Sequence, residues 1–229
     1  MNTSTDPAPH VLTRQRARQL EVVHRAVAEG LAKAARQLSL FVGMHIEIDA
    51  PRLGLCPIEQ LIDSTLGTAF DEAPMGQAER IKTGIYLSIA GDVDGHFLML
   101  LEPEDARALV EPLINELGLD TAARADMTIS ALGEVGNITA CSVLNALADT
   151  TGLRIGPSCP AVVTDMAGAI LEMPMLDVAQ FADEALYIET CISMAEVATT
   201  GVLALIPRPD GLESLIQGLM AAQRKGERR

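Results

Sequence analysis

The sequence predicts an α+β fold built from two copies of one unit: a long helix, a strand, a short helix, a β-hairpin and a final helix. A long helical stretch followed by a strand pattern occurs twice. The landmarks of the hairpin and final helix also recur at one offset, because Gly95 and Pro103 correspond to Gly201 and Pro209. An isolated hairpin is marginally stable, so both hairpins are expected in one continuous, mainly antiparallel sheet. The two long helices would pack on that sheet, related by a pseudo-twofold axis.

The first half begins with a helix. Residues 12–42 lack proline and are rich in Ala, Leu, Arg and Gln, which favours a helix that Gly43 ends. The stretch 45–49 alternates polar and apolar side chains, which predicts a strand with one buried face. Pro51 and Gly54 interrupt this strand. The elements expected next are a short helix over 57–66, a loop over 67–79, strands over 85–89 and 96–101 joined by the turn 91–95, and a helix from Pro103 to about Leu117.

The second half repeats this order. A long helix over about 121–151 is expected to end at Gly152. The elements expected after it are a strand over 153–156, a strand over 161–171, a short helix over 174–182, strands over 185–194 and 199–206, and a last helix that Pro209 opens. We therefore expect pseudo-repeats over about 12–118 and 121–222 in one domain spanning residues 1–229, with flexible tails at 1–11 and 223–229.

The composition excludes several classes of function. Apolar residues make up 48% of the 229 residues and charged residues 21%, as in ordinary globular proteins. The formal net charge of −14 disfavours binding to nucleic acid or to anionic lipid. No apolar run approaches the length of a membrane span, and residues 1–20 do not resemble a signal peptide. A cytoplasmic protein that binds neither nucleic acid nor a membrane is expected.

The cysteines and histidines form no recognisable metal or disulfide pattern. No two cysteines are spaced as Cys-x-x-Cys, and the histidines are scattered. We expect free thiols and no metal site. The four cysteines are Cys56, Cys141, Cys159 and Cys191.

One face of the second long helix carries polar side chains at helical spacing. Ser130, Glu134, Asn137 and Cys141 follow one another at intervals of three or four residues, so they lie on one face. The opposite side, which we expect to be buried, carries Ile129, Leu132, Val143, Leu144 and Leu147.

Two glycines flank the polar face. A glycine inside a helix costs about 1 kcal/mol relative to alanine, so Gly133 and Gly136 suggest close approach of another backbone or of a partner.

This pattern resembles the CheC/CheX/FliY family of chemotaxis phosphatases. Those proteins carry Asp or Ser, three residues, Glu, two residues, Asn, twenty-two residues and then Pro. This chain has Ser130, Glu134, Asn137 and Pro160 at those spacings. The resemblance covers about residues 12–222 and implies a CheC-like fold.

The resemblance also implies a mechanism. In this family the Asn orients a water for in-line attack on the aspartyl phosphate of a CheY-like response regulator, and the Glu reaches a lysine of that regulator. Mg²⁺ is held by the regulator, so the resemblance implies no cofactor bound by this chain. Hydrolysis of an acyl phosphate needs mainly positioning and charge stabilisation, which suits an amide and a carboxylate one turn apart. Glu134 and Asn137 are the residues that match these roles.

The first half departs from the family pattern. Counting back from Pro51 by the same spacing gives Glu21, Arg25 and Ala28. Arg25 would repel the lysine of the regulator, and Ala28 cannot hold a water. We therefore predict one working site, in the second half.

Other interpretations stay open. Glu134 and Asn137 could be polar residues of a solvated face, Ser130 could only shape the helix, and Pro160 could only fix a turn. The resemblance also allows an adaptor that binds the deamidase CheD or a regulator with little phosphatase activity. A structural role like that of the FliM middle domain is disfavoured, because FliM lacks the Glu and Asn pair. A monomer is favoured, since duplication lets one chain supply both halves of the sheet.

Overall fold

The computed structural model describes residues 14–57, 78–181, 183–194 and 197–226. The short helix predicted over 57–66, most of the loop predicted over 67–79 and the predicted N-terminal tail lie outside these residues.

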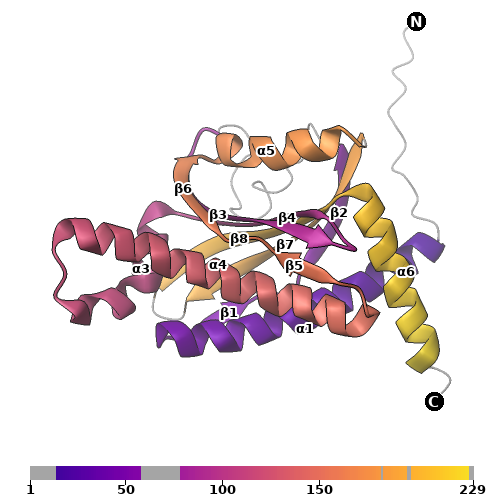
Figure 1. Ribbon diagram of the computed structural model, residues 1–229, viewed down its shortest axis with the longest axis horizontal. Helices are drawn as coiled ribbons and strands as arrows, with labels where there is room; N and C mark the ends of the chain where they lie inside the picture. Colours follow the sequence, from indigo (N-terminus) through magenta and orange to yellow (C-terminus); the bar gives the residue numbers. More distant parts are fainter. Residues whose placement is uncertain (1–13, 58–77, 182, 195–196, 227–229) are drawn as a thin grey trace, which may run out of the picture.

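In the described residues, both halves of the chain contain a long helix, two short strands, a hairpin and a final helix in that order, and the second half also contains α5 (Figure 1). The first half consists of α1 (Arg14–Val42), β1 (Ile46–Ile48), β2 (Arg52–Pro57), β3 (Ile81–Gly91), β4 (Gly95–Leu101), α3 (Pro103–Ile114) and the 3₁₀ turn Asn115–Leu117. The second half consists of α4 (Thr121–Thr151), β5 (Ile155–Pro157), β6 (Ala161–Met166), α5 (Ala167–Ala179), β7 (Glu184–Met194), β8 (Val197–Pro207) and α6 (Pro209–Gly226).

The strands form one antiparallel sheet to which both halves of the chain contribute. Its order is β1-β7-β8-β4-β3-β5, with β2 also paired to β7 and β6 also paired to β3. The hairpins meet at the centre, where β4 pairs with β8. The edge strands of each half pair with the hairpin of the other half, the arrangement that a pseudo-twofold axis produces. The predicted duplicated α+β fold with one continuous sheet is confirmed.

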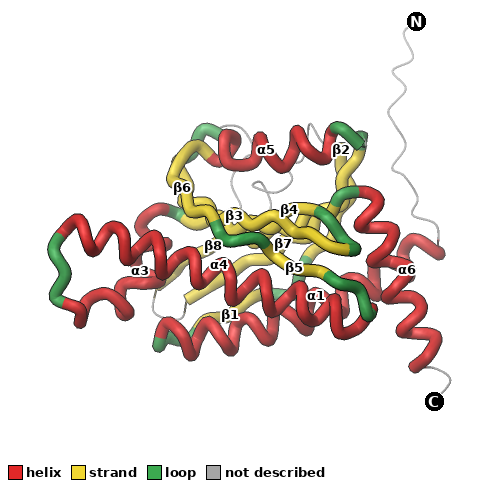
Figure 2. The backbone as a smooth tube through the Cα atoms, in the orientation of Figure 1, coloured by secondary structure: helices red, strands yellow, loops and turns green. Residues whose placement is uncertain are grey.

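The two long helices lie side by side over one face of the sheet, and α5 covers the other face (Figure 2). The larger cluster of buried aliphatic side chains lies between the sheet and the long helices. A smaller cluster lies under α5. The long helices approach closely, because a Cβ built on Gly30 of α1 would lie 2.6 Å from the Cα of Val143 in α4.

A polar network ties α5 to the sheet. Asp177 of α5 accepts two hydrogen bonds of 2.6 Å from Arg208 and lies 2.8 Å from Nε2 of His96. The Nδ1 atom of His96 lies 3.0 Å from the hydroxyl of Tyr86. Burial lowers the pKa of His96 despite the neighbouring carboxylate, so the ring is neutral at pH 7.

Several element boundaries differ from the sequence predictions. Pro51 and Gly54 were expected to end the strand pattern, but β2 runs through Gly54 because it pairs with β7. The strand predicted over 161–171 ends at Met166, and its last residues begin α5. Residues 166–171 carry no polar side chain, and periodicity alone does not separate a buried helix from a buried strand in such a run. The last helix continues to Gly226, into the predicted tail.

Among the described helices, α4 is the one long and apolar enough to span a membrane by length and composition. This differs from the expectation that no apolar run reaches that length. The reason is that Glu134 is the only charged residue between Asp126 and Asp149. However, 56% of the most apolar window is buried inside the fold, and the core helix of a soluble protein passes the same test.

Candidate functional site on helix α4

Both ends of α4 are capped, so its long polar face is held in one continuous helix. At the N-terminus the side chain of Asp120 accepts a 2.9 Å hydrogen bond from the backbone N–H of Ala123. At the C-terminus Gly152 adopts a left-handed conformation with φ 75°, and its N–H bonds to the carbonyl of Ala148 at 2.7 Å. The helix therefore spans the residues that the sequence predicted.

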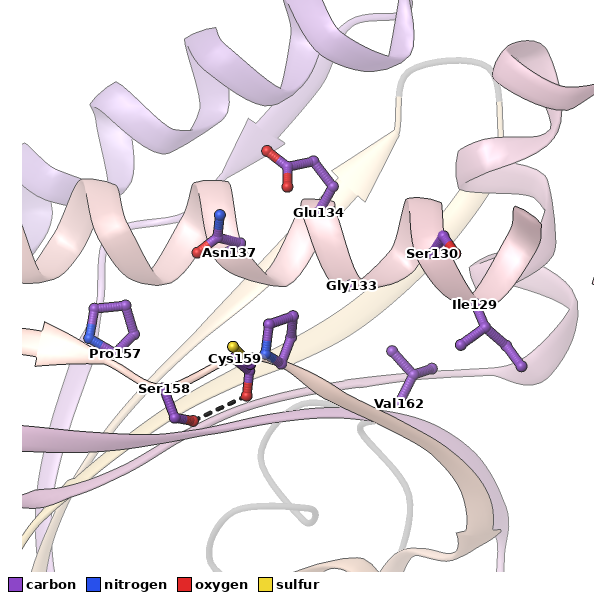
Figure 3. A pocket seen from close by; sticks show the side chains of 10 residues that line it. Ile129, Ser130, Gly133, Glu134, Asn137, Pro157, Ser158, Cys159 and Val162 are labelled. Atoms are coloured by element: carbon purple, nitrogen blue, oxygen red, sulfur yellow. Dashed lines mark hydrogen bonds between the residues drawn. The ribbon is translucent and has the colours of Figure 1, made fainter. Parts of the chain in front are cut away.

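The carboxylate of Glu134 is exposed and unpaired. Within the described part of the chain it has no hydrogen bond or ion pair, and no other charged side chain stands between Asp126 and Asp149. Figure 3 shows it extending from α4 on the side away from Ser158 and Cys159. Such a carboxylate keeps its full capacity to bind an ammonium group of a partner.

Asn137 is half-buried and lies one turn after Glu134 in the wall of an open pocket (Figure 3). The pocket has a volume of about 480 Å³ and lies between α4 and the segment joining β5 to β6. It is lined by Ile129, Ser130, Gly133, Glu134, Asn137, Pro157, Ser158, Cys159, Pro160 and Val162. All four residues of the predicted motif are thus brought together at one pocket.

Two glycines allow close packing on either side of this face. A Cβ on Gly133 would lie 3.3 Å from Cγ of Pro160, so the absence of a side chain lets the proline ring rest against α4. A Cβ on Gly136 would lie 2.4 Å from Cγ2 of Ile85, so this glycine lets α4 sit directly on β3. The close approaches that the sequence suggested are made within the chain itself.

Ser130 makes a local contact in this structure. Its hydroxyl donates a 3.0 Å hydrogen bond to the backbone carbonyl of Asp126, one turn earlier. This is the backbone contact anticipated for a serine that shapes its helix.

The side chain of Asn137 has one described partner. The Sγ atom of Cys141 lies 3.4 Å from Oδ1 of Asn137 and donates to it. Burial, and next the negative charge of Glu134, raise the pKa of the Cys141 thiol, so the thiol remains protonated at neutral pH. Cys141, Cys159 and Cys191 form no disulfide bond.

One residue of the predicted buried side lies elsewhere. Ile129 is 53% exposed and lines the pocket, whereas Leu132, Val143, Leu144 and Leu147 are buried. The expectation for Ile129 was wrong because α4 extends beyond the sheet at this end, so its first turns have little to pack against.

The helix α1 ends in the same way as α4, which identifies the residues of α1 that are equivalent to the predicted motif. Gly43 ends α1 in the left-handed conformation, eight residues before Pro51, just as Gly152 stands eight residues before Pro160. This agreement supports the register that equates Arg25 with Glu134.

In that register, α1 carries a short-range ion pair in place of the unpaired carboxylate. Arg25 lies 3.8 Å from Glu21, and both side chains are largely exposed. Ala28 is half-buried and Pro51 is buried. His24 occupies the position of Gly133.

The sequence did not reveal the wall of the pocket formed by Pro157, Ser158 and Cys159. Their closeness to Pro160 in the chain was the only available signal. Among the described residues, no cluster of three or more His, Cys, Asp or Glu side chains could hold a metal ion.

The fold and the site are both similar to those of CheC-like proteins. A family model described as the CheC-like family matches residues 127–164, the part of the chain that contains Ser130, Glu134, Asn137 and Pro160. The resemblance to the CheC/CheX/FliY family is thereby confirmed.

Particular relatives show the same similarity. The chain is 26% identical to the CheY-P phosphatase CheC of Bacillus subtilis over 208 residues, which cover 89% of this chain and 95% of the relative. The structure of Thermotoga maritima FliY superposes with a TM-score of 0.66 at 16% identity, covering 93% of this chain and 99% of that one. The FliM middle domain of H. pylori superposes with a TM-score of 0.51 at 11% identity, covering 88% of this chain and 98% of that one. These structural neighbours show the fold.

Proposed function

We propose that this chain is a phosphatase that accelerates hydrolysis of the aspartyl phosphate of a CheY-like response regulator. The observation that carries the proposal is the pairing of an exposed, unpaired Glu134 with Asn137 one turn later, beside Pro160, in the segment that matches the CheC-like family. The similarity to a CheY-P phosphatase over 89% of the chain supports the same activity.

Each residue has a distinct task in this proposal. Asn137 donates one hydrogen bond and accepts another, which holds a water in line with the phosphorus–oxygen bond to be broken. Glu134 pairs with an ammonium group of the regulator and fixes the orientation of the complex. The water oxygen forms the new bond to phosphorus, and the aspartate carboxylate of the regulator leaves. The chain binds no cofactor in this proposal, and the required Mg²⁺ resides in the regulator.

The solvent-facing position of both residues suits this chemistry. A macromolecular substrate must bring its phosphorylated residue to the enzyme, so the catalytic groups have to be on an accessible face. Positioning is then the main contribution of this chain.

A second candidate is an adaptor that binds a regulator or CheD with little phosphatase activity. It is favoured by the absence of a Glu and Asn pair from the equivalent face of α1, where Arg25 pairs with Glu21 instead. We expect a cytoplasmic monomer under either proposal.

The test is to mix the purified protein with a phosphorylated CheY-like regulator and Mg²⁺ and to follow the loss of phosphate. The rate should rise with protein concentration and fall for Glu134→Ala. Binding of the regulator without any acceleration by the wild type would reject the phosphatase and favour the adaptor.

A further inference from the structure

We propose that Cys141 is a positioning residue whose thiol holds the side-chain amide of Asn137 in the orientation needed to bind the attacking water. This inference deepens the proposed phosphatase function and rests on it for its kinetic consequence. The orientation itself is a property of the chain alone.

The contact is specific in its direction. The Sγ–H group of Cys141 donates to Oδ1 of Asn137 at 3.4 Å, across one turn of α4. A thiol is a weak donor, but it is the one described partner of this amide. Holding Oδ1 toward the thiol leaves the two N–H donors of the amide directed elsewhere, and Oδ1 keeps a second lone pair for the water.

The surroundings of Cys141 keep it a donor. The residue is half-buried, and both burial and the charge of Glu134 disfavour the thiolate. Glu134 therefore has two effects, one on an approaching partner and one on the protonation of this thiol. A thiolate would be an acceptor and would repel Oδ1.

The first half of the chain offers an internal comparison. In the register set by Gly43 and Gly152, the positions of Asn137 and Cys141 are Ala28 and Ala32. The face that lacks the amide also lacks its thiol partner. The thiol is thus absent where there is no amide for it to orient.

The test uses the full chain with Cys141→Ser, which keeps a donor, and with Cys141→Ala and Cys141→Val, which remove it. Cys191→Ala is the matched control, since it removes a half-buried cysteine side chain from β7, outside the lining of the pocket. We expect kcat for dephosphorylation to fall about 3- to 10-fold in the Ala and Val variants, the range for loss of one neutral hydrogen bond. The KM should be unchanged, and the Ser and control variants should stay close to wild type.

A double-variant cycle and an activity-free measurement complete the test. In an Asn137→Ala background, Cys141→Ala should cause no further loss, because the thiol acts through the amide. The NMR order parameter of the Asn137 side-chain amide should fall in the Ala and Val variants but not in the Ser variant.

The outcomes separate the two proposals. An inactive wild type rejects the phosphatase, while the order parameter still decides whether Cys141 orients Asn137. An active wild type with full kcat in Cys141→Val, or an unchanged amide order parameter in that variant, overturns the positioning role.

Discussion

The open face of α4 and the equivalent face of α1 share a backbone frame but carry different side chains. Both helices end at a left-handed glycine eight residues before a proline. On α4 this frame presents an unpaired carboxylate, an amide and a pocket. On α1 the corresponding positions hold an arginine paired to Glu21 and an alanine. A duplicated frame can therefore be kept for folding while the proposed chemistry is confined to one copy.

The largest expected effect is that of Asn137→Ala, which gives α4 the residue found on α1. Loss of the amide leaves the attacking water unheld, so kcat for dephosphorylation should fall about 100-fold. Asn145→Ala, an exposed change on the same helix, is the matched control and should stay near wild type. Steady-state kinetics with the phosphorylated regulator make the comparison. Equal activity of both variants would contradict the role of Asn137.

Glu134→Arg gives α4 the residue that α1 carries at the equivalent position, Arg25. A guanidinium in place of the carboxylate would repel an ammonium group of the regulator, so the KM should rise about 10- to 100-fold. The reverse change, Arg25→Glu, should leave the KM unchanged because it lies on the other face. An unaltered KM in Glu134→Arg, measured at low ionic strength, would show that this carboxylate does not contact the regulator.

Gly133→Val tests the close packing of α4 against Pro160. The new side chain would push against Pro160, since even a Cβ lies 3.3 Å from the proline ring. Unfolding by urea should show a destabilisation of about 1–3 kcal/mol, and kcat/KM should fall several-fold. Gly156→Val is the control, because nothing lies within 4 Å of a Cβ there. A silent Gly133→Val would mean that the position of Pro160 does not shape the site.

The smallest expected effect is a gain of function on α1. Introducing Arg25→Glu and Ala28→Asn into the Asn137→Ala variant should restore no more than about one tenth of the wild-type rate. The reason is that His24 still stands in place of Gly133, and Ala32 in place of Cys141. The same dephosphorylation kinetics measure it. Full recovery would show that the Glu and Asn pair alone makes a site.

Much of the fold could be predicted from the sequence because the relevant signals are local. Gly43 and Gly152 end their helices where the pattern indicated, since a left-handed conformation suits glycine. The helices α3 and α6 begin at Pro103 and Pro209, the two prolines that recur in the sequence. The meeting of Pro160 with α4 was implied by the spacing of the motif, not by any local pattern.

The remaining features depend on tertiary packing. The strand β2 exists because β7 offers it a partner, which no local pattern shows. The start of α5 was missed because a buried apolar run has no clear period. Ile129 was assigned to the buried side by helical spacing alone, although the first turns of α4 have little to pack against. The bond from Cys141 to Asn137 depends on rotamers that a sequence does not specify.

The measurement that tests the account most directly compares the two faces in one assay. The rate of phosphate loss from a phosphorylated CheY-like regulator is followed with the wild type, with Glu134→Ala/Asn137→Ala and with Glu21→Ala/Arg25→Ala. We predict acceleration by the wild type and by the α1 variant, and a rate equal to spontaneous hydrolysis with the α4 variant. Loss of activity in the α1 variant with activity retained in the α4 variant would contradict the account.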